Sequence, residues 1–186
     1  MNHKIKIIYN NADDYFYFQS LTSASTCSNF NCGISEYNDY LLSDASRSMK
    51  DHIALTWLLT ERTTEKVVAY MSLIMDAIKL SISEKELHNL KYPFRTIPAM
   101  KIAKLAVNSA SSVKYKGLGT FMIESAETIA LECNINYCAA RFLTVDADIE
   151  HDKGVLAFYE KNGFIKNDEL YNKNRLTISM RKDIYQ

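Results

Sequence analysis

The sequence predicts a mixed α/β fold in which a central sheet of six to seven strands is flanked by helices. Strand-like segments joined by short turns dominate the first half of the chain, which is typical of antiparallel pairing. From residue 100 onward, strands alternate with helices, which is typical of parallel pairing. We expect a single domain over residues 1–186, because 186 residues with 47% hydrophobic content suffice for one well-packed core.

The N-terminal part is expected to hold one strand, two helices and a turn. Residues 4–9 alternate between polar and apolar side chains, which indicates a short strand. The aromatic-rich segment 13–21 is interpreted as a short helix, and residues 30–33 as a turn. A second helix then begins with Ser35 as its N-cap and ends near Met49, since apolar residues recur every three to four positions.

The middle of the chain predicts a hairpin of two strands at residues 52–60 and 66–80. The second strand is long enough to carry a bulge near Asp76. A helical turn and an extended crossover follow, at residues 84–90 and 92–98. The extended assignment follows from the two prolines, because a residue that precedes proline avoids the helical region.

A strand, a loop and a helix between residues 100 and 133 form the segment that we expect to bind an anion. An apolar strand at 102–107 is followed by small residues at 108–112, and Gly117 and Gly119 open the helix. Two glycines let the backbone turn tightly, and a helix N-terminus offers free N–H groups to a phosphate. The sequence contains no acid between Glu86 and Glu124, but it contains six basic residues there: Lys91, Arg95, Lys101, Lys104, Lys114 and Lys116.

The C-terminal elements complete the predicted sheet. Residues 138–146 read as a buried strand that runs parallel to the strand at 102–107, because a helix connects the two. A helix over 154–162 follows and ends at Gly163. Two closing strands are expected at residues 164–165 and 175–181.

The glycine spacing separates three families of phosphate-binding loop. A Walker loop is absent, and a dinucleotide fingerprint would need a third glycine where Met122 stands. Gly117 and Gly119 instead resemble the acetyl-CoA pyrophosphate loop of the GNAT superfamily of N-acetyltransferases. Lys114 stands where that loop usually has Arg or Gln, so the charge is kept and the planar group is lost. A glycine-rich turn without a ligand is the alternative.

A second motif strengthens the resemblance. The segment from Tyr159 to Phe164 is similar to the end of the GNAT helix that lies beside the acetyl-CoA thiol. The resemblance implies that Tyr159 donates a hydrogen bond to the departing thiolate. Asp152 stands where the family commonly has Asn. The residues that the resemblance assigns to acetyl-CoA are Leu105, Ala106, Val107, Val113, Lys114, Tyr115, Lys116, Gly117, Leu118, Gly119, Thr120, Asp152 and Phe158.

Short motifs along most of the chain resemble one bacterial branch of the superfamily, which includes toxins that acetylate aminoacyl-tRNA. They include the segments 30–33, 92–93, 97–98, 105–107 and 145–147. The resemblance implies an enzyme that moves an acetyl group from acetyl-CoA to a primary amine by direct attack. Charged tRNA is then one candidate acceptor, and Lys91 and Arg95 are candidates to contact it. An antitoxin and a second copy of the chain are further partners that it allows.

The acceptor can also be judged from amine acidity. A lysine amine, with a pKa of about 10.4, is almost wholly protonated at pH 7, whereas an α-amine, at about 7.7 to 8.0, is neutral in roughly a tenth of molecules. The strand at 102–107 has no carboxylate to relay a proton, which favours an α-amine. Asp76, Asp146 and Asp148 on neighbouring elements keep a general base open. An acetyltransferase for a small-molecule or peptide amine is the alternative.

Two other classes of function remain. A non-catalytic CoA-binding regulator would need Gly117 and Gly119 but would have no need for Tyr159. A nucleotide-binding redox protein would need a third loop glycine and an acidic residue about 20 positions later. The presence of Tyr159 favours an enzyme.

Composition and cysteine spacing exclude several classes. A formal net charge of zero argues against a general nucleic-acid coat, although a local basic patch stays open. The sequence shows no membrane-spanning run and no signal peptide, so we expect a cytoplasmic protein that does not bind membranes. Two cysteine pairs with four intervening residues, Cys27 with Cys32 and Cys133 with Cys138, are a weak zinc pattern, and no metal is expected.

Overall fold

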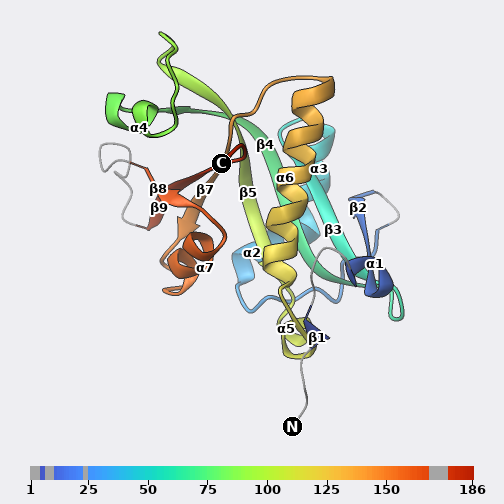
Figure 1. The fold of residues 1–186 in the computed structure, drawn as a ribbon. Coiled ribbons are helices and arrows are strands. Elements are labelled where there is room, and N and C mark those ends of the chain that lie inside the picture. The colour runs from blue at the N-terminus through green and yellow to red at the C-terminus, as the bar shows by residue number, and fades with distance from the viewer. Residues whose placement is uncertain (1–4, 7–10, 23–24, 168–175) are drawn as a thin grey trace. The chain divides into compact units, whose positions relative to one another are not determined.

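The computed structural model describes residues 5–6, 11–22, 25–167 and 176–186 (Figure 1). The chain divides into two compact units, one of residues 1–74 and 103–125 and the other of residues 75–102 and 126–186. The seven-stranded sheet contains β2 (Phe16–Ser20), β3 (Leu55–Glu61), β4 (Lys66–Lys79), β5 (Thr96–Val107), β7 (Phe142–Asp148), β8 (Ile165–Lys166) and β9 (Thr177–Asp183), in the order β2-β3-β4-β5-β7-β9-β8. The predicted mixed α/β fold with a flanked mixed sheet is confirmed.

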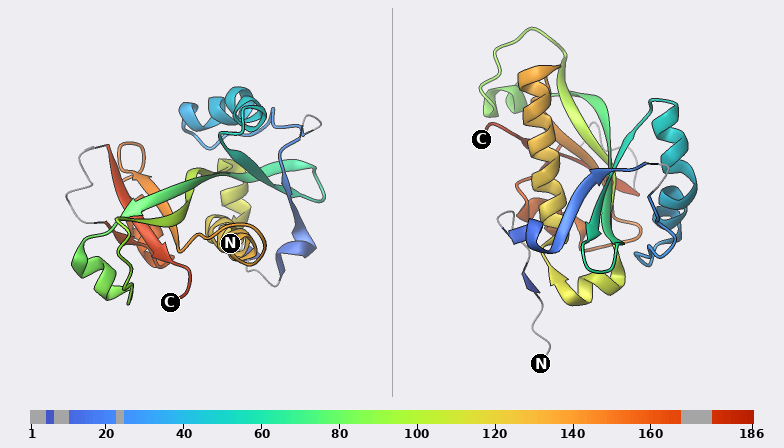
Figure 2. Two further views of the ribbon diagram at one scale, coloured as in Figure 1. Left: turned by 90° about the horizontal axis from the view of Figure 1, so that it is seen from above. Right: turned by 90° about the vertical axis from the view of Figure 1, so that its right-hand side faces the viewer.

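Antiparallel strands build the first unit. β2 pairs with β3, and β3 pairs with β4 with a register irregularity at Leu59 and Thr60. The segments α2 (Ser35–Asp39), η2 (Tyr40–Asp44) and α3 (Ala45–Lys50) cover one face of these strands, and the first turns of α6 (Leu118–Asn136) cover the other (Figure 2).

Apolar residues that alternate along the strands supply the packing of the first unit. Leu58 of β3 and Tyr70 of β4 are buried with Leu41 and Ala45 of the helical segment. On the other face, the ring of Phe18 contacts the ring of Phe121 edge-on, with centroids 6.4 Å apart. Each strand therefore buries one set of side chains against each helical layer.

The second unit holds the parallel pair that the sequence predicts. β5 and β7 run parallel, with Ala99 opposite Phe142, while β7 and β9 are antiparallel. Phe142, Ala99, Ile97 and Leu80 form a buried cluster against which Leu90 packs. The helices of this unit are α4 (Ile82–Leu87), α7 (Val155–Lys161) and the remainder of α6.

One predicted helix is wrong over most of its length. Only Ala12–Tyr15 is helical, as α1, and Phe16–Ser20 forms β2. The reason is tertiary, because aromatic residues fit a pleated surface and β3 offers an open edge for pairing. Ser35 is also not the N-cap of its helix, since Ile34 holds that position.

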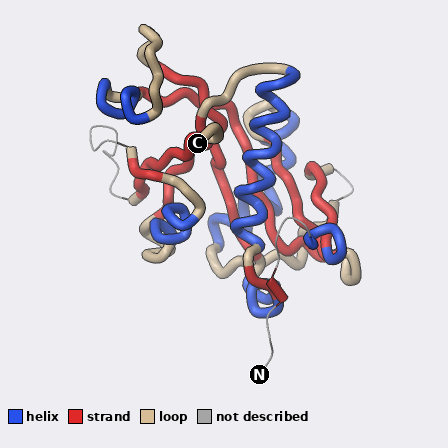
Figure 3. Tube along the Cα trace, viewed as in Figure 1, coloured by secondary structure: helices blue, strands red, loops and turns tan. Residues whose placement is uncertain are grey.

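The predicted loop at 108–112 is mostly helical. Ser109–Lys114 forms α5, and Tyr115–Lys116 forms β6, which pairs in parallel with β1 (Ile5–Lys6) in a second, two-stranded sheet (Figure 3). The sequence signal for α5 is Asn108, whose side chain caps it. The other parts of the strand predicted at 4–9, and residue 175 of the last predicted strand, lie outside the described residues.

The remaining elements agree with the prediction to within a few residues. The predicted helix after Ser35 is continuous, although its middle is a π-helical segment at Tyr40–Asp44. The strand predicted at 138–146 is shifted to Phe142–Asp148. Within the described residues, the structure contains no helix that is long and apolar enough to cross a membrane.

Candidate active site

The segment that follows β5 begins with the polar residue Asn108. Its backbone N–H donates to the Val68 carbonyl of β4 at 2.8 Å, which fixes the end of β5. Its side-chain oxygen accepts from the N–H groups of Ala110 and Ser111 at 3.0 and 3.4 Å. These N–H groups at the start of α5 are thus already satisfied, so α5 is poorly suited to hold an anion.

Gly117 makes the turn from β6 into α6. Its φ of +91° lies in the left-handed region, which glycine adopts without the steric cost that a Cβ would bring. The first helical hydrogen bond of α6 runs from the Phe121 N–H to the Gly117 carbonyl at 2.8 Å. The N–H groups of Leu118, Gly119 and Thr120 precede that bond and lie at the positive end of a 19-residue helix.

An ion pair from β3 neutralises the lysine of this loop. The Lys114 ammonium donates to the Glu61 carboxylate at 2.6 Å, and the Tyr115 hydroxyl and Thr64 also donate to it. Burial disfavours the charged carboxylate, but the hydrogen bonds from Lys114, Thr64 and Tyr115 outweigh it and lower the pKa of Glu61 to about 2. The hydrogen bond to Glu61 in turn raises the pKa of Lys114.

The residues of β5 that the resemblance assigns to acetyl-CoA lie just before this loop. Ala106 is buried, and Leu105 and Val107 are half-buried. Lys104, one residue earlier, makes an ion pair with Glu36 of α2 and lies over the ring of Tyr37, 4.5 Å from its centroid. A carboxylate from another element, Glu36, therefore lies next to β5. The sequence of the strand, which contains no carboxylate, did not indicate this.

Tyr159 occupies α7 in the second unit. It is 5% exposed, and its ring contacts Phe158 and Phe164 edge-on, with centroid distances of 5.1 and 5.3 Å. Burial raises the pKa of the Tyr159 hydroxyl well above its usual value. At neutral pH the group is consequently a neutral hydroxyl that can donate a hydrogen bond.

Gly163 ends this helix segment as predicted. Its φ is +84°, and a Cβ there would lie 3.3 Å from the Lys182 side chain. The turn returns the chain so that the Phe164 N–H donates to the Tyr159 carbonyl at 3.0 Å. The motif from Tyr159 to Phe164 is therefore a helix end that packs Phe164 against the tyrosine ring.

Asp152 and Phe158 take different places around α7. The Asp152 side chain is exposed and accepts from the Gly154 N–H at 2.7 Å, so it organises the start of the helix. Phe158 is half-buried. The Phe158 ring contacts the Tyr159 ring edge-on.

The predicted substrate residues, Lys91 and Arg95, are both exposed in the segment between α4 and β5. Within the described part of the chain, neither forms an ion pair, whereas Lys101 pairs with Asp146 at 2.5 Å. Asp76, another acid left open as a base, accepts from the Thr144 hydroxyl at 2.7 Å.

The structure brings the predicted residues together in two groups. Residues 105–107 and 113–120 belong to the first unit, and Lys91, Arg95, Asp152, Phe158 and Tyr159 belong to the second. The acetyl-CoA residues predicted from the sequence did not include Asn108 and Glu61, two polar residues that form hydrogen bonds with this loop. Asn108 before a stretch of small residues is a helix-capping pattern, so the sequence could have identified Asn108. Nothing in the sequence places Glu61 next to Lys114.

The four cysteines are free thiols. Among the described residues, the group of metal-ligating side chains whose ligand atoms lie within 4.8 Å of one another is Asp148, Glu150 and His151, and it contains no cysteine. Burial raises the pKa of Cys27 and of Cys133, so both are neutral thiols at neutral pH.

No family model matches the chain, and a search of curated proteins found no match. Several solved structures do match. A Tyr-to-Phe mutant of KacT is 16% identical with a TM-score of 0.75, and the match covers 92% of this chain and 96% of that one. AtaT complexed with acetyl-methionyl-tRNAfMet is 20% identical with a TM-score of 0.72, covering 88% and 93%. AtaTR bound with acetyl-CoA is 20% identical with a TM-score of 0.71, covering 92% and 95%. The chain therefore has the fold of KacT and AtaT, which is the GNAT-like fold that its sequence predicts.

Proposed function

We propose that the chain is an acetyl-CoA-dependent N-acetyltransferase whose acceptor is the α-amine of aminoacyl-tRNA. The observation that carries the acetyl-CoA assignment is the left-handed turn at Gly117, which opens α6 with three N–H groups that lack helical acceptors. The fold shared with AtaT, for which a complex with acetyl-CoA is known, supports the same assignment.

The pyrophosphate is held by backbone groups more than by lysine charge. Lys114 is already paired with Glu61, so the positive end of α6 supplies most of the attraction at this loop. The exposed Lys116 adds a charge that the described residues do not neutralise. In this proposal the backbone N–H groups bind the anion, while Lys114, which stands where the GNAT loop usually has Arg or Gln, forms an ion pair within the chain.

Tyr159 acts on the leaving thiolate as a hydrogen-bond donor. Full transfer of a tyrosine proton to a thiolate is uphill by about 2 kcal/mol even at the reference pKa values of about 10 and 8.5. Burial raises the tyrosine pKa further and makes complete transfer more costly. A hydrogen bond that strengthens as the C–S bond breaks is therefore the role that the environment of Tyr159 supports.

Two observations favour aminoacyl-tRNA as the acceptor. AtaT shares this fold and has been solved with acetyl-methionyl-tRNAfMet. Lys91 and Arg95 are exposed cations without ion pairs in the described structure, so they are available to phosphate. A small-molecule or peptide amine is the second candidate, favoured by the formal net charge of zero. A non-catalytic CoA-binding regulator has no use for a buried donor at Tyr159.

The acceptor is tested by incubating the chain with labelled acetyl-CoA and separate fractions of charged tRNA, peptides and small amines. Mass spectrometry should find the label on the α-amine of the aminoacyl group. Label found only on a small amine would refute tRNA as the acceptor, but it would still support acetyl transfer from acetyl-CoA. Co-purification from the native host would show whether an antitoxin accompanies the chain, as AtaR does in a solved complex of AtaT.

The acetyl-CoA site is tested at Gly119. In Gly119→Asp, a carboxylate at the first turn of α6 faces the pyrophosphate, so acetyl-CoA affinity should fall at least 100-fold, which corresponds to about 2.7 kcal/mol. Gly119→Ala is the matched control, because it adds a methyl group without charge and should weaken binding far less. Isothermal titration calorimetry measures the acetyl-CoA affinity of both variants. A folded Gly119→Asp chain with unchanged affinity would refute the assignment of acetyl-CoA to this loop.

A further inference from the structure

The segment between α4 and β5 presents two aromatic rings to solvent among basic side chains. Tyr92 and Phe94 are 60% and 65% exposed, and their rings stack with an interplanar angle of 19° and a centroid separation of 6.4 Å. Lys91 and Arg95 flank them and are exposed. Two neighbouring exposed rings form an apolar patch with cations on either side in the sequence, which is typical of an interaction surface.

The pair is preorganised by its backbone. Pro93 fixes its own φ and biases Tyr92 toward extended geometry, so the backbone between the two rings has little conformational freedom. The Lys85 ammonium donates to the Phe94 carbonyl at 2.6 Å and closes residues 85–94 into a loop. The rings therefore lose little conformational entropy when they bind.

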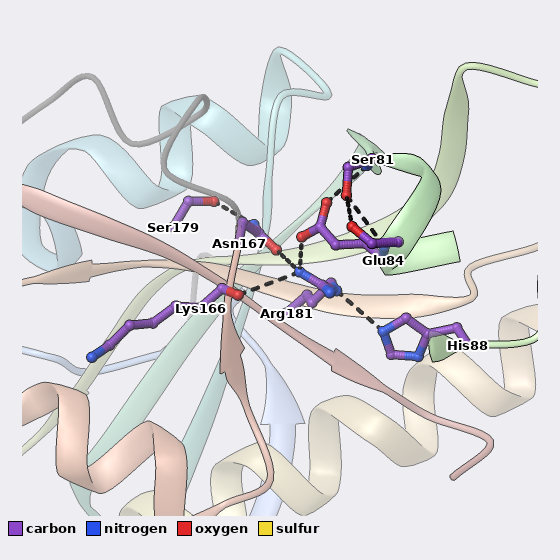
Figure 4. Close-up of polar contacts among 8 residues, drawn as sticks. Ser81, Glu84, His88, Lys166, Asn167, Ser179 and Arg181 are labelled. Atoms are coloured by element: carbon purple, nitrogen blue, oxygen red, sulfur yellow. Dashed lines mark hydrogen bonds and ion pairs between the residues drawn. The ribbon is translucent and has the colours of Figure 1, made fainter. Parts of the chain in front are cut away.

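A buried ion cluster anchors this loop to the sheet. Arg181 of β9, which is 1% exposed, donates to Glu84 of α4 at 2.5 Å and to Asn167 at 2.8 Å (Figure 4). Its Nε also donates to His88 Nε2 at 3.2 Å, and because arginine only donates, the His88 proton must lie on Nδ1, which contacts Asp183 at 2.9 Å. Both ends of α4 are thus attached to β9.

We propose that Tyr92 and Phe94 form a stacking platform for unpaired nucleotides at the 3′ end of the RNA acceptor, with Lys91 and Arg95 contacting its phosphates. The inference rests on the proposed function and names the part of the acceptor that this surface recognises. Aromatic faces bind any base by stacking, and interleaved cations contact the backbone, which together are the features of a single-strand binding surface. A duplex offers no free base faces, so the platform selects the unpaired end.

The choice of RNA over a protein partner follows from charge. Lys91 and Arg95 are exposed and flank the two rings in the sequence, and no acid occurs in the sequence between Glu86 and Glu124. An apolar partner would leave both cations at the edge of a dry interface without an acceptor. Phosphate supplies that acceptor.

The test compares the affinity of the full chain for deacylated tRNA and for the same tRNA trimmed to remove its unpaired 3′ nucleotides. The wild type should bind the intact RNA more tightly. Tyr92→Leu/Phe94→Leu keeps apolar bulk but removes the ring faces, so it should lose that preference, with intact-tRNA affinity falling about 5- to 100-fold. Tyr137→Leu, a control at a ring that is 85% exposed elsewhere in the second unit, should keep it.

Two results would overturn the platform. They are a wild type without preference for the intact RNA and a double variant that keeps the preference. If a double variant that keeps the preference also differs from the wild type in oligomeric state, the rings belong to a contact with a second copy of the chain. A wild type that prefers the intact RNA but never acetylates charged tRNA would support the platform and refute the proposed acceptor, so the two failures are distinguishable.

Discussion

Tyr159 is the residue whose hydroxyl the proposed chemistry requires. Its ring packing does not depend on that hydroxyl, so the hydroxyl can be removed while the packing is kept. The ring contacts Phe158 and Phe164 through its edges and faces, and these contacts need no oxygen. Replacing Tyr159 with Phe therefore removes the donor and keeps the ring.

In Tyr159→Phe, turnover should fall by roughly 10²- to 10⁴-fold, the range attributed to a positioned acid or donor, while acetyl-CoA affinity changes little. Single-turnover acetyl transfer and calorimetric binding measure the two effects. Tyr137→Phe, at a solvent-exposed ring, is the control and should keep full turnover. Near-normal turnover of Tyr159→Phe would make Tyr159 a packing residue.

Glu61 gives a second prediction at the scale of single residues. Its pKa of about 2 in the folded chain lies below the usual value of about 4.3, so the folded state favours the charged carboxylate. The stabilisation is fully present above about pH 4.5 and is lost as the pH falls toward 2. Glu61→Gln should therefore be less stable than wild type at pH 7, and the difference in urea midpoint should shrink steadily from pH 4.5 to 2. A difference that stayed constant with pH would contradict the ion pair.

At the scale of elements, α4 depends on its attachment to β9. Glu84 caps α4 through Ser81 and also neutralises Arg181, so one carboxylate serves both the helix and the buried cation. A buried charge that loses its partner is far more costly than a lost surface ion pair.

Glu84→Ala should accordingly lower the free energy of unfolding by about 3 to 5 kcal/mol, because Arg181 keeps its charge without the carboxylate. Glu86→Ala is the matched control on the same helix, since Glu86 is exposed and its removal should change stability by no more than about 0.5 kcal/mol. Chemical denaturation measures the free energy of unfolding of both variants. Equal values would show that the ion pair between Glu84 and Arg181 is not needed to hold α4.

For the molecule as a whole, the zero net charge and the local cations lead to a specific expectation. Long-range attraction to RNA is weak in a neutral chain, so binding must come from a few phosphate contacts that salt weakens. If RNA is the acceptor, kcat/KM for charged tRNA should fall steeply between 50 and 200 mM salt, as general counterion release requires.

Lys91→Glu should lower tRNA acetylation and reduce the slope of its salt dependence, with acetyl-CoA affinity unchanged. Lys50→Glu is the control, because Lys50 is an exposed lysine at the end of α3 in the first unit. Salt-independent acetylation of a small amine, with both variants active, would favour the metabolite acceptor.

Local chemistry explains which features of the fold could be predicted. The conformations of Gly117 and Gly163 follow from residue type, since only glycine takes a positive φ without steric cost. Helices after Ser35 and Leu118 follow from apolar periodicity. The segment Phe16–Ser20 could not be assigned in this way, because its strand state depends on pairing with β3, about 40 residues later.

The sequence by itself determined the glycine turn that opens α6 and the helix end that carries the tyrosine motif of α7, because each depends on interactions within a few residues. It did not determine the full order of elements, since the strand state of β2 depends on pairing with β3. Only the tertiary structure decided the charges around them. Lys114 sits in an acid-free stretch of sequence but is neutralised by Glu61, 53 residues away, and Arg181 is held by Glu84, 97 residues away. Electrostatic pairing acts through space and is independent of chain distance. One basic stretch in the sequence therefore holds lysines that pair with acids of the chain, such as Lys114, and exposed lysines, such as Lys91, that form no ion pair with the described residues.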